Sequence, residues 1–228
     1  MERGFNKIIN IWGPDHHGYI ARLKAAVAAL GGDRDALEVI IVQLATIFRD
    51  GKPLSMSTRR GQYISLREVL DEVGKDAARF FFLMRHTSAP LEFDLALAKK
   101  QTPENPVYYV QYAHARIHSI LKLARPSHLK PKKDKFHLMK ETEETDLIKT
   151  LGQFSDILQV CAGQRDPFPL SCYLQNLAAV FHKFYDRHRV VDEEKADLSG
   201  ERLGLIEAAG IVLSRGLRLL GVNAPEKM

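Results

Sequence analysis

The sequence predicts a mainly helical protein in two parts, an α/β segment over residues 1–72 and an all-α bundle over residues 73–228. Three observations lead to this prediction. Near the N-terminus, two apolar β-branched runs flank one helical pattern. Amphipathic helical periodicity then continues to the C-terminus without convincing strand alternation. The composition, 45% hydrophobic and 27% charged, is that of an ordinary globular protein.

The first part reads as strand, helix, strand. Residues 7–12 (KIINIW) and 36–48 (ALEVIIVQLATIF) have the character of strands. Between them, residues 18–31 have helical periodicity and end on Gly31 and Gly32. This order is that of a βαβ unit. Two strands and one helix cannot bury a doubly wound sheet, so we expect the chain to be part of a longer protein.

Helix signals mark the second part. Ser65, followed three residues later by Glu68, predicts a capping box. Pro106 suits the first turn of a long helix that runs to about residue 124. Further helices are predicted over residues 75–87, 145–164, 170–191 and 200–221.

A charged segment separates two of these helices. Residues 125–140 contain six lysines and arginines and one acid, and residues 141–146 then contain four acids. An exposed linker whose charges partly cancel is the simplest interpretation. The alternative is that the basic half contacts a nucleic-acid backbone.

Composition limits the class of function. The net charge of +5 and the pI of about 9.1 favour polyanionic partners only mildly. No apolar run is long enough to cross a membrane, and the N-terminus lacks the apolar core of a signal peptide. Cys161 and Cys172 match no zinc motif. We therefore expect a reduced, cytoplasmic protein with no metal site of its own.

The strand end WGPDHHG, residues 12–18, is a candidate ligand site. Ligands of α/β folds bind where a strand ends and a helix follows. Gly13 permits close backbone approach, and Asp15 can accept hydrogen bonds from ribose hydroxyls or a cationic substrate. His16 and His17 can donate to phosphate. An ordinary loop and a metal site are the alternatives.

The stretch GKPLSMSTRRG, residues 51–61, follows the second apolar run. Backbone N–H groups, hydroxyls and guanidinium groups of this kind bind triphosphates and stabilise charge that develops on them. Basic hairpins are also common, so the pattern alone decides nothing. The side chains concerned are Lys52, Ser55, Ser57, Thr58, Arg59 and Arg60.

The long helix carries Tyr109, Tyr112 and Arg116 within an arc of about 60°. A neighbouring arc, which includes Val110 and Ile117, is apolar. Such rings can stack unpaired bases at about 1–3 kcal/mol each. Tyrosines that complete the core and hydrogen-bond locally are the plainer interpretation.

These segments, in this order, resemble bacterial arginyl-tRNA synthetase, a class I aminoacyl-tRNA synthetase. The likeness rests on IWGPDHHGYIARLKAAVAALGG, PLSMSTRRGQYISLREVLDEVG, DAARFFFLMR, NPVYYVQYAHARI, FHKFYDRHRVV and LGVNAPEKM. It implies that residues 1–72 are the C-terminal part of a Rossmann-type catalytic domain and that residues 73–228 are an anticodon-binding bundle. Nothing similar to the family's first signature motif occurs, so we expect a C-terminal piece that is inactive alone.

The resemblance also implies roles for single residues. The SMSTR loop stands where the family's Lys-Met-Ser-Lys-Ser loop closes over ATP, but only Met56 and Ser57 match that signature. The implied catalytic set is Lys52, Ser55, Met56, Ser57, Thr58, Arg59 and Arg60. The implied ATP and arginine contacts are Gly13, Asp15, His16 and His17. The implied anticodon contacts are Tyr109, Tyr112, Arg116, Tyr185 and Met228.

The implied ligands are ATP with Mg²⁺ and L-arginine, and the implied partner is an arginine tRNA, without DNA or a membrane. Two other classes stay open. Asp15, His16 and His17 also form the motif that names a manganese phosphoesterase family, although only Glu2 precedes them as an upstream acid. A helical module that docks protein through its tyrosine stripe is the second.

Overall fold

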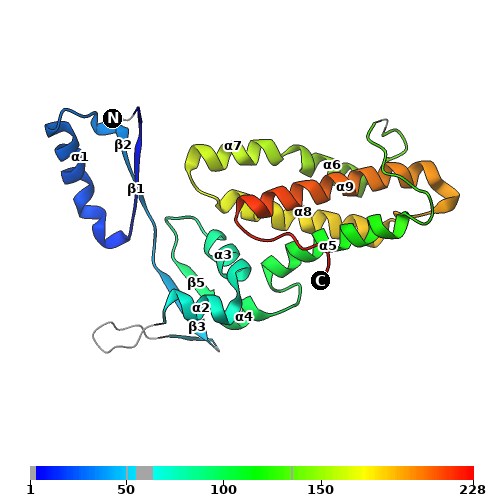
Figure 1. The fold of residues 1–228 in the computed structure, drawn as a ribbon, viewed down its shortest axis with the longest axis horizontal. Helices are drawn as coiled ribbons and strands as arrows, with labels where there is room; N and C mark the ends of the chain where they lie inside the picture. Colours follow the sequence, from blue (N-terminus) through cyan, green and yellow to red (C-terminus); the bar gives the residue numbers. More distant parts are fainter. Residues whose placement is uncertain (1–3, 50, 55–63, 135) are drawn as a thin grey trace. The chain divides into compact units, whose positions relative to one another are not determined.

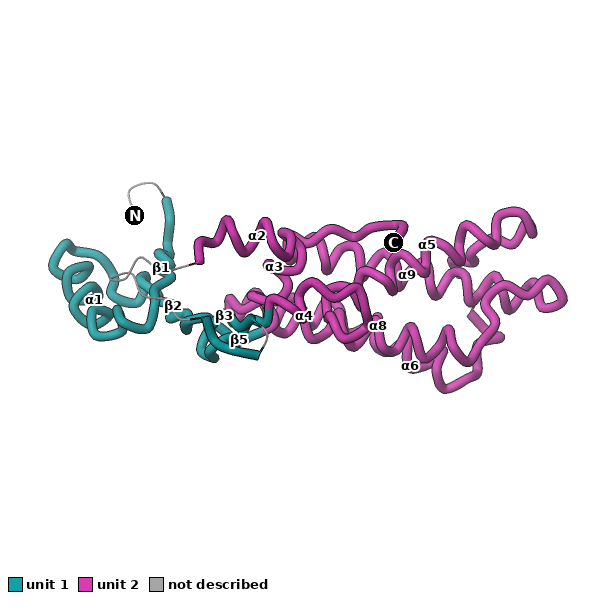
Figure 2. Tube along the Cα trace, turned by 90° about the horizontal axis from the view of Figure 1, so that it is seen from below, with its two compact units in different colours: residues 1–54, 85–94 teal, residues 55–84, 95–228 magenta. Residues whose placement is uncertain are grey.

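The computed structural model describes residues 4–49, 51–54, 64–134 and 136–228. The chain divides into two compact units, which Figure 2 distinguishes by colour. Unit 1 comprises residues 1–54 and 85–94, and unit 2 comprises residues 55–84 and 95–228. The domain boundary predicted after residue 72 stays a prediction.

Unit 1 begins with the predicted βαβ order (Figure 1). β1 pairs in parallel with β2, so that Ile8 lies opposite Leu37 and Trp12 opposite Ile41. The connection between these strands contains the helix α1. The elements, in order, are β1 (Ile8–Trp12), η1 (Pro14–Tyr19), α1 (Ile20–Ala29), η2 (Arg34–Ala36) and β2 (Leu37–Ile41).

The second sheet of unit 1 differs from the sequence prediction. β3 (Ala45–Arg49) pairs antiparallel with β4 (Lys52–Pro53) and parallel with β5 (Leu91–Asp94). The single strand predicted over residues 36–48 is therefore wrong, because β2 and β3 belong to separate sheets. β5 also corrects the prediction that residues 73–228 contain helices alone. Its partner strand lies far away in the sequence, and four residues are too few to show alternation.

Unit 2 is built from helices, and two of its predicted helix starts are confirmed. Ser65 caps α2 by accepting from the backbone N–H of Glu68, whose carboxylate accepts from the N–H of Ser65. Pro106 lies in the first turn of α5, with Asn105 as its N-cap. The helices are α2 (Leu66–Val73), α3 (Lys75–Leu83), α4 (Leu95–Lys99), α5 (Pro106–Ala124), α6 (Thr142–Gly152), α7 (Phe154–Gln164), α8 (Phe168–Arg187) and α9 (Ala196–Leu219), with η4 (Glu193–Lys195) before α9.

The core of unit 2 lies where α5, α8 and α9 meet. Ile117 of α5, Leu174 of α8 and Leu213 of α9 are fully buried. α9 approaches α8 closely at Gly216, where a Cβ would lie 2.5 Å from a methyl carbon of Leu174. Each fully buried side chain of this kind contributes about 1.5–3 kcal/mol, so these three helices form the stable frame of the unit.

The C-terminal tail, residues 220–228, is held on unit 2 through its backbone. Arg79 and Gln111 donate to tail carbonyl groups, and the Nδ1 atom of His114 lies against a third. The acceptors are the carbonyl oxygens of Leu220, Asn223 and Pro225, at 2.7, 2.9 and 2.8 Å. Gly221 has a φ of 69°, and a Cβ there would lie 2.4 Å from Nε of Arg79.

Candidate nucleic-acid interface

An arginine of α5 stacks on aromatic rings from two helices. Tyr112 and Arg116 are four residues apart, which places them on one face of α5. The guanidinium carbon of Arg116 lies 5.4 Å from the ring centroid of Tyr112 and 5.0 Å from that of Tyr185 on α8. The sequence placed Tyr112 and Arg116 on one arc of the helix by periodicity and added Tyr185 only through the resemblance, and the structure brings the three together.

His182 of α8 completes this cluster and was not singled out in the sequence. Its ring centroid lies 4.8 Å from that of Tyr109 and 5.7 Å from that of Tyr112. His182 and Tyr185 are three residues apart and therefore share a face of α8. That spacing, next to the buried Phe181, is the signal that could have found His182. We call Tyr109, Tyr112, Arg116, His182 and Tyr185 the aromatic site.

Two buried nitrogen atoms of the aromatic site lack a hydrogen-bond partner within the described residues. They are Nε of Arg116 and Nε2 of His182. A buried polar group without a partner costs about 1–3 kcal/mol, so such groups call for an explanation. A ligand that supplies an acceptor to Arg116 is one explanation with a clear physical benefit.

Burial sets the protonation of the site. It lowers the pKa of His182, opposed by the backbone of Tyr109 and the carboxylate of Asp186. It raises the pKa of Tyr109, and the charge of Asp186 raises that pKa further. At neutral pH the imidazole is therefore uncharged and the phenol keeps its proton. Ring faces beside a permanent guanidinium cation suit the stacking of unpaired bases.

The tail that ends at Met228 follows another side of α5. Its anchors there are Gln111 and His114, and a carboxylate oxygen of Glu226 lies 3.9 Å from Nδ1 of His118. At about 100° per residue, these positions point away from the face that carries the aromatic site. The structure therefore does not group Met228, which is 52% exposed, with the other predicted anticodon contacts.

In unit 1, two of the four predicted strand-end residues lie beside an open hollow of about 780 Å³, a volume within the usual range for small-molecule sites. Asp15 and His16 both line it, with Oδ2 of Asp15 3.6 Å from Nε2 of His16. The other lining residues are Trp12, Tyr19, Arg22, Leu23 and Ala26.

Gly13 and His17 do not line the hollow. Gly13 precedes η1, and a Cβ there would lie 2.8 Å from Oδ1 of Asp15, so a side chain would displace that carboxylate. His17 is exposed. In the ranges that the structure describes, no group of three or more His, Cys, Asp or Glu side chains is placed to hold a metal ion.

Most of the predicted signature loop lies outside the described residues. Lys52 is described: it is exposed, lies in β4 and is opposite Arg49 of β3. The predicted residues outside the described ranges are Ser55, Met56, Ser57, Thr58, Arg59 and Arg60. Within the described residues, no helix has both the length and the apolarity to cross a membrane.

The profile of one protein family, described as the DALR anticodon binding domain, matches residues 110–228. An arginine–tRNA ligase of Geobacter sp. (strain M21) is 50% identical over 228 residues, which are 99% of this chain and 41% of the relative. One from Listeria monocytogenes is 48% identical over 229 residues, which are 100% of this chain and 41% of that relative. The chain thus spans about 41% of the length of these curated relatives.

Solved structures agree with this fold. A chain from Campylobacter jejuni, described provisionally as an arginyl-tRNA synthetase, superposes with a TM-score of 0.88 and is 36% identical. The match covers 100% of this chain and 49% of the Campylobacter jejuni chain. The arginyl-tRNA synthetase of Thermus thermophilus has a TM-score of 0.74 at 23% identity, over 98% of this chain and 41% of its own, which shows the fold alone. The predicted fold class is confirmed. Neither the phosphoesterase nor the protein-docking alternative gains support.

Proposed function

Because the chain belongs to the DALR anticodon binding domain family, we propose that unit 2 binds the anticodon loop of an arginine tRNA through the aromatic site. One observation carries this proposal. Arg116 lies against the rings of Tyr112 and Tyr185 while its buried Nε has no acceptor in the described part of the chain. An unpaired base supplies both a flat face for the rings and acceptor atoms for the guanidinium group.

The two helices divide the work in this proposal. α5 contributes Tyr109, Tyr112 and Arg116, and α8 contributes Tyr185 and His182. Burial keeps His182 neutral while its other ring nitrogen donates to the backbone of Tyr109, so Nε2 is an acceptor for a donor on a base edge. Ring stacking tolerates every base, so the preference for one anticodon comes from these polar groups rather than from the rings.

We further propose that the whole protein is an arginine–tRNA ligase. The arginine carboxylate attacks the α-phosphorus of ATP and displaces pyrophosphate, which leaves arginyl-AMP. A ribose hydroxyl of the tRNA then attacks the arginyl carbonyl carbon, forms an ester and releases AMP. The hollow beside Asp15 and His16 suits the nucleoside and the amino acid, and Lys52, together with Arg59 and Arg60, which lie outside the described residues, brings cations to the phosphates. Mg²⁺ enters mainly on the ATP phosphates. The proposed setting is the cytoplasm.

The 228-residue chain by itself is proposed not to form arginyl-adenylate, since the residues that match the family's first signature are not in it. An arginine-dependent exchange of pyrophosphate into ATP by this chain would contradict that statement.

The test of anticodon binding uses an arginine tRNA transcript, the same transcript with its anticodon loop replaced, and the Arg116→Lys variant. Lysine keeps the positive charge but lacks the planar guanidinium group, which stacks on rings and donates two parallel hydrogen bonds. We expect the variant to lose about tenfold or more in affinity for the cognate transcript and to bind the two transcripts alike. Arg215→Lys, an exposed arginine of α9, is the matched control and should change neither value. Equal binding of both transcripts by the unchanged protein would overturn the proposal.

A further inference from the structure

A second basic surface lies away from the aromatic site, at the C-terminal end of α5 and the segment that follows it. We define the basic linker surface as Lys122, Arg125, His128 and Lys130, which line one hollow of about 420 Å³, together with the adjacent Lys133. Its lysines and arginine are exposed. Within the described residues they have no ion pair, although Glu207 lies on the rim of the hollow and Asp134 follows Lys133.

The segment is fixed on α9 rather than loose in solvent. The N–H of Lys132 donates to the carbonyl oxygen of Gly200 at 2.8 Å, and its ammonium lies 2.8 Å from Asp197. The N–H of Leu138 donates to the carboxylate of Glu201 at 2.8 Å. This close approach requires small residues on α9. A Cβ on Gly204 would lie 2.1 Å from the carbonyl oxygen of Lys132.

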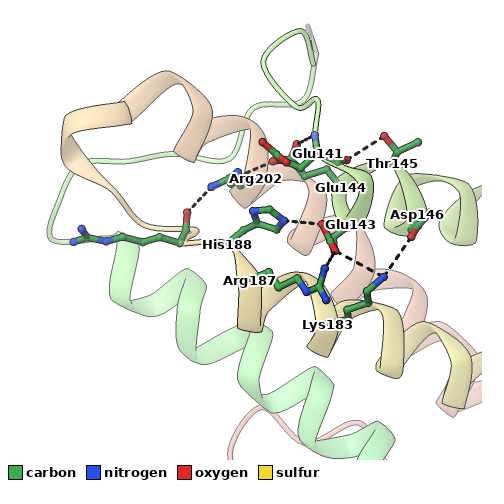
Figure 3. A network of polar contacts seen from close by, with 10 residues as sticks. Glu141, Glu143, Glu144, Thr145, Asp146, Lys183, Arg187, His188 and Arg202 are labelled. Carbon is green, nitrogen blue, oxygen red and sulfur yellow. Dashed lines mark hydrogen bonds and ion pairs between the residues drawn. The ribbon is translucent and has the colours of Figure 1, made fainter.

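Three of the four acids that follow the linker have partners on α8, at His188 or on α9, and the fourth, Glu141, is the N-cap of α6 (Figure 3). Glu143 lies between Lys183, Arg187 and His188, and Glu144 accepts from Nε of Arg202 at 2.7 Å. Both carboxylates are buried, with 7% and 0% of their residues exposed. Glu143 remains ionised, since its hydrogen bond with His188 and its other partners lower its pKa to about 2.

This arrangement separates charges that lie side by side in the sequence. The interpretation of residues 125–146 as a linker whose charges cancel assumed that both halves face the same solvent. In the structure, the buried glutamates have partners of their own, and the lysines and arginine of the basic linker surface are left without them in the described part of the chain. Exposed cations that have no ion pair in the described residues, on a segment held against α9, are complementary to phosphates.

We propose that the basic linker surface binds the phosphate backbone of the RNA whose unpaired bases enter the aromatic site. The inference rests on the proposed function for the identity of that RNA. Contacts to phosphate carry no sequence information, so this surface adds affinity for any RNA of the right shape and leaves discrimination to the aromatic site. Each contact also displaces a condensed counterion, which makes its contribution depend on salt.

The experiment measures binding of the cognate and loop-replaced transcripts across a salt series, for the unchanged chain and for Arg125→Gln/Lys130→Gln. Two lost contacts should lower the slope of log affinity against log salt by about 1.4–1.8, at about 0.7–0.9 each. Both transcripts should weaken by the same factor. The control is Lys149→Gln/Arg215→Gln, which removes the same charge from exposed positions of α6 and α9 and should leave the slope unchanged. Far-UV circular dichroism verifies that both variants are folded.

Several results would overturn the inference. An unchanged slope in the linker variant is one, and an equal loss in the control is another, because net charge alone would then explain the effect. A loss confined to the cognate transcript would assign these side chains to base reading. Failure of the proposed function has a different signature. If the unchanged chain binds both transcripts alike, the anticodon proposal fails, but the salt slope still tests whether the basic linker surface binds phosphate. If the unchanged chain binds neither transcript, both proposals fail.

Discussion

Units 1 and 2 contain similar apolar residues but differ in how far these residues are buried. In unit 1, Ile11 is 69% exposed, Leu44 is 70% exposed and α1 has no buried residue. In unit 2, Leu213 and Phe181 are completely buried between helices. Apolar side chains stabilise a fold only when they leave water, so equal hydrophobicity in the sequence does not mean equal stability.

The difference shows that a βαβ unit and a helical bundle differ in what must cover their apolar faces. A helix bundle buries its stripes against its own neighbours. A parallel two-stranded sheet has two faces and needs a layer on each. Unit 1 therefore presents an apolar surface that calls for further covering, whereas the core of unit 2 is closed by its own helices.

The largest expected effect is on the core of unit 2. Leu213→Ala removes a fully buried side chain and should lower the free energy of unfolding by about 2–5 kcal/mol. Denaturant unfolding followed by far-UV circular dichroism, which reports mainly on the helices, measures this loss. In unit 1, Ile11→Ala should cost less than about 0.5 kcal/mol. The fluorescence of Trp12, the single tryptophan, follows that unit.

Similar losses at Leu213 and Ile11 would break the comparison, because they would show that Ile11 is covered in solution. If the Trp12 fluorescence changes at a lower denaturant concentration than the helical circular dichroism signal, unit 1 unfolds before unit 2, and the difference between the two units is larger than their burial alone shows.

A smaller effect is expected where the linker contacts α9. Gly204→Ala places a methyl group against the carbonyl oxygen of Lys132, so the linker must move. Such overpacking costs about 1–3 kcal/mol. The helical transition in denaturant measures this, and Gly163→Ala on α7, where a Cβ meets nothing within 4 Å, is the matched control. Equal stability of the two variants would mean that the linker is not held against α9.

The smallest effect at neutral pH is expected for Glu143→Gln, because Lys183 and Arg187 are half exposed and can return to water. The effect shows in acid. The hydrogen bond with His188, followed by its other partners, lowers the pKa of Glu143 from 4.5 to about 2. A depressed native pKa contributes stability above pH 4.5 that is lost as the pH falls toward 2.

The unfolding midpoint of unit 2 should therefore fall less steeply with acid in Glu143→Gln than in the unchanged chain. The comparison is made between pH 4.5 and 2, with Glu193→Gln as an exposed control. Parallel curves for Glu143→Gln and the unchanged chain would remove Glu143 from the acid response.

Local signals predicted much of unit 2, because they act within a few residues. The Ser65–Glu68 capping box and Pro106 at a helix start are such signals, and both are confirmed. The strand over residues 36–48 was divided wrongly because β3 is defined by pairing with β5, far away in the sequence. An apolar run does not show where one sheet ends and another begins.

The sequence predicted only the part of the aromatic site that lies on α5. Periodicity placed Tyr109, Tyr112 and Arg116 on one stripe of a helix. It did not predict that His182 and Tyr185 of α8 meet them, since that contact depends on how two helices pack. For the linker, the sequence prediction was misleading. The basic residues 125–140 and the acids after them were assumed to cancel, but in the structure the buried glutamates pair with arginines of α8 and α9 instead.

The attachment of the C-terminal tail has a consequence for how this region can change over evolutionary time. Arg79 and Gln111 hold it by carbonyl groups, which every amino acid possesses. Substitutions at most tail positions therefore keep the same anchors, and selection acts on the helices that donate. Gly221 is an exception, because its positive φ and the closeness of Arg79 exclude a side chain. Leu220 and Val222, which are buried, and Asn223, whose side chain donates to Asp76, are constrained as well. Homologous tails should thus diverge most freely after residue 223.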